Sequence, residues 1–408
     1  MSAPNLDDTD FYSPDVQVCP FPFYQAMRDN GPVYQLPGTN IYVLSRHRDV
    51  LEAFTRPNIF SSHRPPLGGA DPEFLSILAH GYRTEPTLTT SDPPAHTKYR
   101  KLIKRWFTAS AVAAREPGLR DTVNELIDAF AGDGRAEFVA QFAEALPARI
   151  VGDFLGQPRE MAPQLKQWAR DISQSVNPVV PRDRALEYTR SAVEFQHYFA
   201  ADIEKKQANP GTDFLSFLVN ATIDDEPISM EALLDYVRVF ITGGNDTVTS
   251  LLSNTMYYLL KNPDQFAEVR ADRSLLPAAI EETIRYDTPG QFFTRLLEHG
   301  DAVIGGVTIP QGSRVLLMAG SANRDEQVFP EPDRFDIHRT TTPHLAYGHG
   351  IHFCLGAPLA RLEARISYEL LLDRLPGLRS AIPIEQVQFI AQPILRQVKR
   401  LPLEFDPA

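Results

Sequence analysis

The apolar residues of the chain recur mostly with the spacing of amphipathic helices. Between about residues 93 and 287 they return every three or four positions, and one such face consists of Leu119, Val123, Leu126, Ile127 and Phe130. This spacing places side chains on one face of an α-helix. A last long helix is predicted from about residue 358 to 375, so most of the chain is expected to be helical.

Short strands are predicted near both ends of the chain. Residues 33–36 and 41–44 flank a Pro-Gly-Thr-Asn turn, which is the pattern of a β-hairpin. Strand patterns return at residues 302–304, 307–309 and 315–318. The hydrophobic pattern therefore predicts a mainly α-helical protein with small β-sheets.

Residues 229–261 predict one unusually long helix. The segment contains no proline, and Asn262 and Pro263 end the pattern. About 33 residues at about 1.5 Å each give roughly 50 Å, so we expect this helix to cross the centre of the molecule. Its middle contains Gly243 and Gly244, each of which costs about 1 kcal/mol relative to alanine. Two glycines at this place indicate either a bend or a function.

The composition is that of one large globular domain. Of 408 residues, 43% are hydrophobic, and the 34 prolines and 23 glycines are scattered without forming a linker. We predict a flexible acidic N-terminus at residues 1–15 and a single domain at 16–408, with a helix-rich lobe and a smaller β-containing lobe. The sequence has no signal-peptide pattern and no run of about 18 apolar residues. A cytoplasmic enzyme without a membrane span is therefore expected.

Charge and cysteine content exclude further classes. The net charge of −12 disfavours non-specific binding to nucleic acid. The charge is uneven, because residues 98–105 contain five basic residues and no acidic one. The two cysteines, Cys19 and Cys354, cannot form a disulfide framework, and a reducing cytosol argues against a single bridge. Cys19 is predicted to be a packed N-terminal residue.

Cys354 lies in a segment that predicts a glycine-rich loop leading into a helix. Pro358 suits a first helical turn, and the N–H groups of Leu355 and Gly356 can point at the sulfur and stabilise a thiolate. Glycines at 348, 350 and 356 leave room for a large flat ligand. A dinucleotide site lacks its strand-and-helix context, and a zinc site with His344, His349 and His352 lacks paired cysteines. A buried structural cysteine beside a turn is the remaining alternative.

Residues 347–361, YGHGIHFCLGAPLAR, resemble the haem-binding signature of the cytochrome P-450 family. They match Phe-Gly-x-Gly-x-His-x-Cys-x-Gly-x-x-Leu-Ala-Arg at every fixed position except the first, where Tyr347 replaces phenylalanine. The ring is kept, but the added hydroxyl needs a partner. The resemblance implies the cytochrome P-450 fold with the long helix over the haem. It also implies haem b as cofactor, Cys354 as the axial ligand of the iron, and Gly348 and Gly356 against the cofactor.

Other motifs follow in the family's order, from about residue 20 to 405. Glu282 and Arg285 match the family's Glu-x-x-Arg and can pair across one helical turn. By the same resemblance Arg334, in Pro-Asp-Arg-Phe, joins them in a structural ion network. Taken alone, Glu282 and Arg285 would be an ordinary surface pair.

The resemblance also implies which residues bind the haem propionates. His96 and Arg100 are one turn apart and share a helix face, which suits an anionic carboxylate. Arg295 and His352 resemble the family's other propionate-binding residues. Without the family, His96 and Arg100 would be interpreted as a solvated helix face.

The glycine pair resembles the family's central helix above the haem. Thr247 lies four residues after Gly243, so its hydroxyl can bond that carbonyl, bend the helix and open a groove for O₂. Asp246 lies about 100° away around the helix and can deliver protons, which makes Thr247 and Asp246 the predicted catalytic residues. A mere kink is the alternative.

The implied reaction is R–H + O₂ + two electrons + two protons → R–OH + H₂O. A hydrogen-peroxide-driven peroxygenase is a second possibility, but its members replace the Asp-Thr pair. A non-enzymatic haem-thiolate sensor would usually carry a regulatory domain, for which one fold of 408 residues leaves no space. The chain contains no flavin or nicotinamide domain, so electrons are expected from a ferredoxin and its reductase. The basic segment 98–105, with Arg361 and Arg365, is the predicted docking site.

The predicted substrate is a small hydrophobic organic molecule. Family likeness and helical geometry suggest a mostly apolar lining formed by Val239, Phe240, Gly243, Phe292, Phe293, Pro393 and Ile394. The same residues are also ordinary core formers, so both interpretations stay open. Residues 64–90 are expected to form a loop over the pocket.

Overall fold

The computed structural model describes residues 5–6, 8–63, 71–175, 177, 179–340 and 343–407. The chain forms two compact units, each built from non-contiguous segments. Unit 1 comprises Met1–Ser62, Val112–Ala143 and Thr247–Ala408, and unit 2 comprises His63–Ala111 and Glu144–Asp246. Residues 1–4 and 7 of the predicted flexible N-terminus lie outside the described residues. Within that predicted segment, the side chain of Ser13 already caps the first helix, because it accepts from the N–H of Val16.

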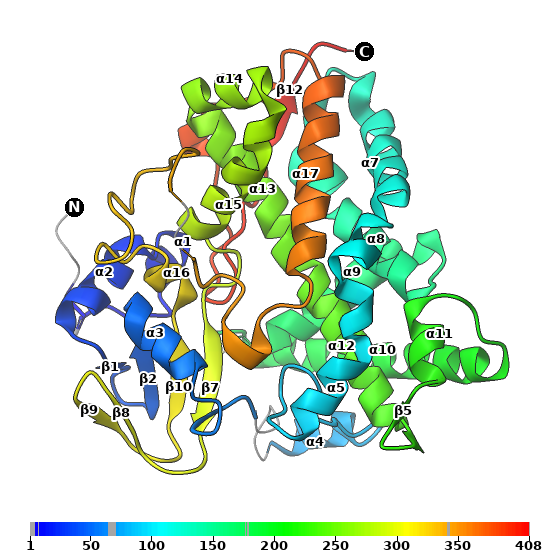
Figure 1. Ribbon diagram of the computed structural model, residues 1–408, viewed down its shortest axis with the longest axis vertical. Coiled ribbons are helices and arrows are strands. Elements are labelled where there is room, and N and C mark those ends of the chain that lie inside the picture. Colours follow the sequence, from blue (N-terminus) through cyan, green and yellow to red (C-terminus); the bar gives the residue numbers. More distant parts are fainter. Residues whose placement is uncertain are drawn as a thin grey trace. The chain divides into compact units, whose positions relative to one another are not determined.

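The largest sheet lies in unit 1 and has the order β1-β2-β10-β7-β3. Its strands are β1 (Tyr34–Gln35), β2 (Ile41–Leu44), β10 (Arg314–Leu317), β7 (Phe293–Leu297) and β3 (Phe60–Ser61). β10 runs parallel to β2, and the other pairs are antiparallel. The hairpin predicted at 33–44 is therefore confirmed as β1 and β2, and Figure 1 shows β2, β10 and β7 side by side.

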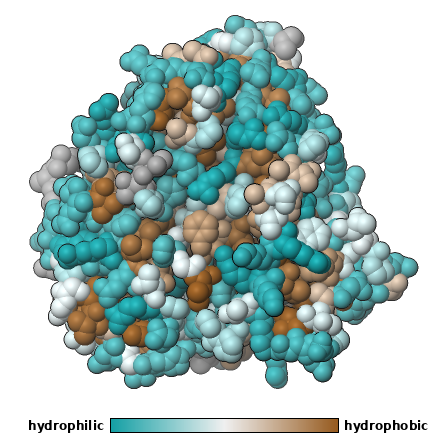
Figure 2. Space-filling view, in the orientation of Figure 1, coloured by the Kyte–Doolittle hydropathy of each residue, from teal (hydrophilic) through white to brown (hydrophobic). Residues whose placement is uncertain are grey.

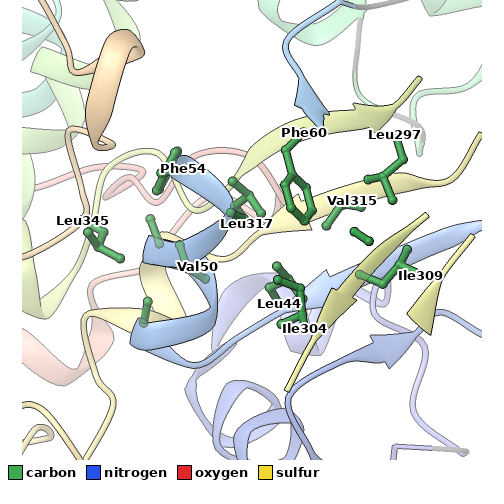
Figure 3. Close-up of a cluster of buried hydrophobic side chains, with 14 residues drawn as sticks. Leu44, Val50, Phe54, Phe60, Leu297, Ile304, Ile309, Val315, Leu317 and Leu345 are labelled. Carbon is green, nitrogen blue, oxygen red and sulfur yellow. The ribbon is translucent and has the colours of Figure 1, made fainter. Parts of the chain in front are cut away.

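An apolar cluster packs the helix α3 (His47–Phe54) against this sheet (Figure 3). Val50 and Phe54 of α3 meet Leu44, Val315 and Leu317 of the sheet, and all five are at most 5% exposed. Alternate residues of β10 point to this face, as the period-two pattern requires. The cluster fixes the end of α3 beside β7, which matters for the site below.

The rest of unit 1 is mainly helical, with two smaller sheets. The sheets are β11 (Arg379–Ser380), β12 (Pro402–Glu404) and β4 (Arg135–Glu137), and the hairpin β8 (Ala302–Ile304) and β9 (Val307–Ile309). The helices besides α3 are α1 (Pro14–Val18), α2 (Phe21–Asn30), α7 (Glu116–Ala131), α13 (Asp246–Lys261), α14 (Pro263–Ala271), α15 (Leu276–Tyr286), α16 (Ala319–Ala322) and α17 (Ala357–Arg374). Short turns of helix lie at Val139–Ala143, Arg273–Leu275, Gly350–His352 and Ile384–Gln386. α17, orange in Figure 1, packs along α7 and α15.

Unit 2 is almost entirely helical. Its helices are α4 (Pro72–Leu78), α5 (Ala95–Ile103), α8 (Ala145–Leu155), α9 (Ala162–Ser175), α10 (Arg182–Ala208), α11 (Phe214–Val219) and α12 (Met230–Gly244). Two 3-10 turns, Lys104–Phe107 and Arg159–Met161, and the hairpin β5 (Thr222–Ile223) and β6 (Glu226–Pro227) complete it, and α6 (Ala109–Ala113) spans its boundary. Trp168 of α9 packs against Phe195 and Phe199 of α10 in its core.

The long helix predicted at residues 229–261 begins and ends as predicted but is interrupted. Ser229 caps α12 by accepting from the N–H of Ala232, and α13 ends at Lys261. The interruption is at Asn245, directly after the two glycines where the sequence indicated a bend. The predicted mainly helical fold with small sheets is confirmed.

Polar residues cover most of the face shown in Figure 2, and apolar residues lie between them in small groups. Among the described residues, no helix combines the length and the apolar character needed to span a membrane.

Candidate functional site

A glycine-rich loop carries Cys354 to the start of α17. Gly348 and Gly350 have φ angles of 68° and 70°, a left-handed conformation that favours glycine. The N–H of Cys354 donates to the carbonyl of Tyr347 (2.9 Å), and the N–H of Phe353 donates to that of Gly350 (3.1 Å). These bonds close the loop and leave the side chains of Cys354 and Phe353 exposed.

The backbone around Cys354 suits a thiolate and a flat ligand. Gly356 is the N-cap of α17, and no described side chain caps this end, so its first N–H groups can face a negative sulfur. A Cβ added at Gly356 would lie 3.8 Å from the Sγ of Cys354. One added at Gly350 would lie 3.1 Å from the carbonyl oxygen of Phe54. An exposed sulfur in a closely packed glycine loop fits the haem that the resemblance implies.

His352 and Arg295, two predicted propionate-binding residues, lie beside the same strand. The Nε2 of His352 and the Oγ of Ser62 are 2.9 Å apart. Ser62 follows Ser61, which pairs with Leu296 in the antiparallel register of β3 and β7. The next position in that register is Arg295. The structure therefore brings these two predicted residues together within unit 1.

Phe54, at the end of α3, links this strand to the Cys354 loop. Its ring centroid lies 5.2 Å from that of Phe293 and 5.7 Å from the guanidinium of Arg295. A Cβ added at Gly348 would lie 3.7 Å from the same ring. The predicted residues Arg295, Phe293 and Gly348 thus share one neighbour that the sequence did not indicate.

Two other predicted pocket residues are also brought together in unit 1. The N–H of Gln291 donates to the carbonyl of Ile394 (2.8 Å). Phe292 is the residue after Gln291, so the chain brings it close to Ile394. Phe292, Phe293 and Ile394 are half-buried, and their role in a pocket stays a prediction. Of the predicted covering loop, residues 64–70 lie outside the described residues.

The two glycines of α12 have different surroundings in unit 2. A Cβ added at Gly244 would lie 2.8 Å from the Cγ2 of Val151 on α8, so glycine allows α12 and α8 to pack closely. Gly243 is exposed, and a Cβ there would meet no described atom within 4 Å. Val239, one turn earlier, is half-buried. Packing within the described part of the chain therefore does not require a glycine at position 243, which agrees with its predicted place beside a bound ligand.

Phe240 lies in an aromatic cluster of unit 2. Its ring centroid is 4.2 Å from that of Phe214, 5.7 Å from Phe107 and 6.1 Å from Phe154. Position 240 lies about 100° around α12 from position 239, so the two side chains diverge. These contacts support the core-forming role that the sequence left open for Phe240.

His96 and Arg100 keep the predicted one-turn spacing on α5. His96 is 2% exposed and Arg100 is half-buried. The structure therefore excludes the fully solvated face that would be the interpretation without the family.

Asp246 lies in a polar cluster with residues of α9. Burial raises the pKa of Asp246 to about 6, although Arg170, a hydrogen bond with the Ser173 side chain and Lys166 act to lower it. Arg170 also donates to Glu144 (2.9 Å), and Lys166 pairs with the same carboxylate. A carboxyl group with this pKa can both take up and release protons near neutral pH.

Asn245 is a residue of the site that sequence reasoning missed. It is 1% exposed, and its Nδ2 donates to the carbonyl of Ile241 (2.7 Å). Asparagine side chains compete in this way with backbone hydrogen bonds and favour helix ends, so its position before Asp246 was the available signal. The predicted bond from Thr247 to the carbonyl of Gly243 stays a prediction.

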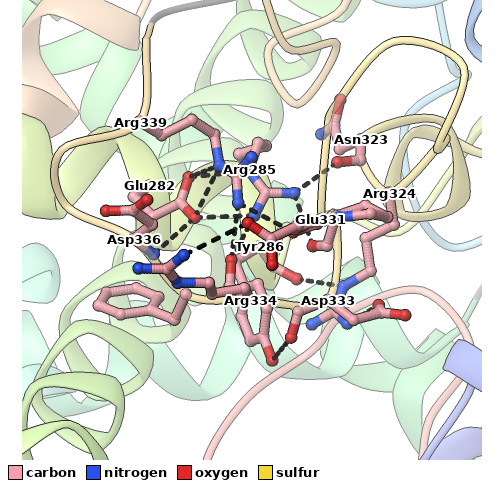
Figure 4. A network of polar contacts seen from close by, with 12 residues as sticks. Glu282, Arg285, Tyr286, Asn323, Arg324, Glu331, Asp333, Arg334, Asp336 and Arg339 are labelled. Carbon is pink, nitrogen blue, oxygen red and sulfur yellow. Dashed lines mark hydrogen bonds and ion pairs between the residues drawn. The ribbon is translucent and has the colours of Figure 1, made fainter.

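The predicted ion network exists, but one member differs (Figure 4). Arg285 and Glu282, 3% and 4% exposed, form two hydrogen bonds of 2.8 Å. Arg334 contributes only its backbone carbonyl, which accepts from Arg285 (3.3 Å), while its side chain turns outward to Glu331. Arg339 supplies the second guanidinium, with its Nε 3.2 Å from both carboxylate oxygens of Glu282. The prediction for the Arg334 side chain is wrong because the loop turns this residue toward solvent.

Glu363 is a second residue that the sequence did not single out. It lies on α17, is 3% exposed, and its Oε2 has no hydrogen-bond partner among the described residues. Burial raises its pKa to about 8. Glu363 shares the buried face of α17 with Ser367 and Leu371 at four-residue spacing, and that spacing was the only signal.

Comparisons with known proteins agree over nearly the whole chain. The family model described as Cytochrome P450 matches residues 23–376. The chain is 34% identical over 413 residues to the cytochrome P450 monooxygenase PikC of Streptomyces venezuelae, covering 99% of this chain and 95% of that protein. It is 32% identical over 412 residues to the 6-deoxyerythronolide B hydroxylase of Saccharopolyspora erythraea, covering 99% of both. The solved structure of cytochrome P450 CYP109Q5 from Chondromyces apiculatus matches with a TM-score of 0.86 at 33% identity, covering 99% of this chain and 100% of that one.

Proposed function

This chain belongs to the cytochrome P450 family and is a cytochrome P450 monooxygenase, and on that premise we propose that it inserts one oxygen atom of O₂ into a hydrophobic organic substrate with electrons from a ferredoxin. The observation that carries the proposal is the exposed Cys354 at the start of α17. When haem b is bound, thiolate ligation favours cleavage of the O–O bond.

The residues that the family resemblance assigns to the cofactor would hold the haem. Cys354 would ligate the iron, and Gly348 and Gly356 would leave room beside it. His352 and Arg295 of unit 1 would bind propionate groups, because paired side-chain donors suit a carboxylate. His96 and Arg100 of unit 2 would do the same, as their spacing on α5 supports.

Asp246 and Thr247 would handle protons. The pKa of Asp246, about 6, suits a group that accepts and releases protons at neutral pH. Arg170 is 48% exposed, so the cluster around Asp246 has one side chain in water. Thr247, the next residue, would present a hydroxyl to the O₂ groove that the family resemblance implies.

The electron donor would meet the basic segment at residues 98–105. Lys101, Lys104 and Arg105 are exposed, whereas Lys98 pairs with Asp224. Arg361 and Arg365, also predicted for this surface, are paired with Glu281 and with Glu116 and Glu369, respectively. Among the described residues of this segment, Lys101, Lys104 and Arg105 therefore carry charge without an ion pair that would attract an acidic ferredoxin, and such steering weakens as salt rises. The cytoplasmic location stays a prediction.

The carbon monoxide spectrum tests the central proposal. The reduced holoenzyme with carbon monoxide should show the long-wavelength absorption band of thiolate ligation, and Cys354→Ser should lose it. Cys19 is exposed, so the prediction that it is packed is wrong. Cys19→Ser is the matched control and should keep the band. An unchanged band in Cys354→Ser would place the ligand elsewhere. Full turnover with hydrogen peroxide, and none with reduced ferredoxin, would favour the peroxygenase instead.

Charge reversal tests the donor surface. Lys101→Glu and Lys104→Glu should lower ferredoxin-supported turnover at low salt, and the difference from wild type should shrink as ionic strength rises. Lys399→Glu, another exposed lysine, should match wild type. Equal rates in all variants at every salt concentration would exclude this segment as the docking site.

A further inference from the structure

A charged side chain packs directly beside the Cys354 loop in unit 1. The guanidinium of Arg361, on the second turn of α17, lies 4.6 Å from the ring centroid of Tyr347. Tyr347 in turn accepts the backbone hydrogen bond of Cys354 (2.9 Å). A permanent positive charge therefore packs on the ring of the residue whose backbone carbonyl holds Cys354.

Glu281 of α15 neutralises this charge. Its two carboxylate oxygens accept from the Nε (2.6 Å) and the Nη2 (2.9 Å) of Arg361, which is a bidentate pair. Although burial acts to raise it, hydrogen bonds from Arg361 and His344 lower the pKa of Glu281 to about 2. Glu281 is therefore ionised near neutral pH, and its charge opposes that of Arg361.

Arg361 and Cys354 interact electrostatically. Hydrogen bonds to Glu281 raise the pKa of Arg361 although burial acts to lower it, and the nearby Glu281 carboxylate and Cys354 sulfur raise it further. Glu281, Arg361 and Cys354 are thus close enough for a change in one charge to alter the energy of another.

The neighbouring carboxylate shows that this pair is separate from the ion network of Figure 4. Glu282 faces Arg285 and Arg339, whereas Glu281 faces α17. Successive residues of a helix point about 100° apart. Two consecutive glutamates therefore serve two sites, and Glu281 can be changed without removing the buried Glu282 pair.

We propose that the Glu281–Arg361 pair, held against the Cys354 loop by the Tyr347 ring, sets the electron density on the Cys354 sulfur and thereby the reduction potential of the iron. An unopposed Arg361 would stabilise negative charge on the sulfur, weaken its donation to the iron and favour the reduced state. An unopposed Glu281 would do the reverse. Glu281 and Arg361 are positioning residues in this proposal, and it rests on the proposed ligation of haem iron by Cys354.

The test is a charge cycle measured by spectroelectrochemistry of the holoenzyme. Glu281→Gln should raise the iron midpoint potential, and Arg361→Gln should lower it, because each leaves the opposite charge unopposed. A tenfold change in the one-electron reduction equilibrium in each direction corresponds to about 59 mV. The double variant should return close to the wild-type potential. Resonance Raman should show a lower iron–sulfur stretching frequency in Glu281→Gln and a higher one in Arg361→Gln.

The signs distinguish an electrostatic role from a merely structural one. A loosened loop would move both single variants in the same direction and the double variant further, and that result would overturn the proposal. So would unchanged potentials in both. If one single variant fails to fold with haem, the direction of the potential shift in the other single variant and the potential of the double variant still test the proposal. Glu268→Gln, which removes a carboxylate paired with His338 (2.7 Å), is the matched control and should not shift the potential. Absence of the thiolate band in wild type would instead refute the proposed function itself.

Discussion

Replacing Glu363 by glutamine should change how the stability of the protein depends on pH. Glu363 is almost fully buried on α17, its Oε2 has no described hydrogen-bond partner, and burial raises its pKa from 4.5 to about 8. A neutral carboxyl is therefore buried at neutral pH. Glutamine has nearly the same shape and cannot ionise, so Glu363→Gln removes the titration and little else.

The sign and size of the effect depend on how far the pKa of Glu363 differs between the folded and the unfolded protein. A group whose folded pKa is raised keeps its full stabilising contribution below the unfolded pKa and loses it as pH rises toward the folded pKa. Raising a pKa by one corresponds to about 1.36 kcal/mol, so the wild type should lose about 4 kcal/mol relative to the variant between about pH 5 and pH 8. The variant should gain in comparison even if the glutamine itself costs a constant amount at all pH values.

Urea unfolding of the holoenzyme across this pH range, followed by circular dichroism, measures the difference. Glu204→Gln, which removes an exposed carboxylate from α10, is the control and should run parallel to wild type. If the difference between wild type and Glu363→Gln is flat from about pH 5 to pH 8, Glu363 is ionised throughout and the reasoning from burial is wrong.

Two further predictions concern the interrupted helix. Gly244→Ala should lower the free energy of unfolding by about 1–3 kcal/mol, because the added methyl group overpacks against Val151. Gly243→Ala should not lower it, because the added Cβ meets no described atom within 4 Å. Thermal unfolding of the two variants checks this, and equal losses of stability would contradict the packing argument. Thr247→Ala should keep oxygen consumption while most electrons go to hydrogen peroxide in place of product. Coupling equal to wild type, measured as product formed per electron pair, would mean that another group handles the protons.

The sequence predicted what depends on local chemistry. The glycines of the Cys354 loop and the ends of the long helix follow from backbone preferences of neighbouring residues. Cys354, His352 and Arg295 were found because a motif marks each of them. The contact of Phe54 with Arg295 and Phe293 was not predicted, since no local pattern records which helix end meets β7.

The missed residues depend on where loops and helix faces turn. Arg334 and Arg339 lie five residues apart in one loop, and only tertiary structure decides that the Arg339 side chain reaches Glu282. Phe240 was predicted to line the pocket, and its packing against Phe214 and Phe154 becomes clear only when α11 and α8 are in place. Glu363 looks like any surface glutamate until α17 is packed along α7 and α15.

The order of strands in the main sheet affects how the chain must be made. β2 pairs with β10, and the flanking residues Asn40 and Gly312 that hydrogen-bond to each other are 272 positions apart. During synthesis, the β2 edge of the β1–β2 hairpin, which pairs with β10, therefore stays unpaired until most of the polypeptide has left the ribosome. By contrast, every segment of unit 2 has been synthesised once residue 246 is made. Exposed strand edges promote aggregation, so the yield of folded enzyme should be governed by how well this hairpin is protected while it waits for its partner.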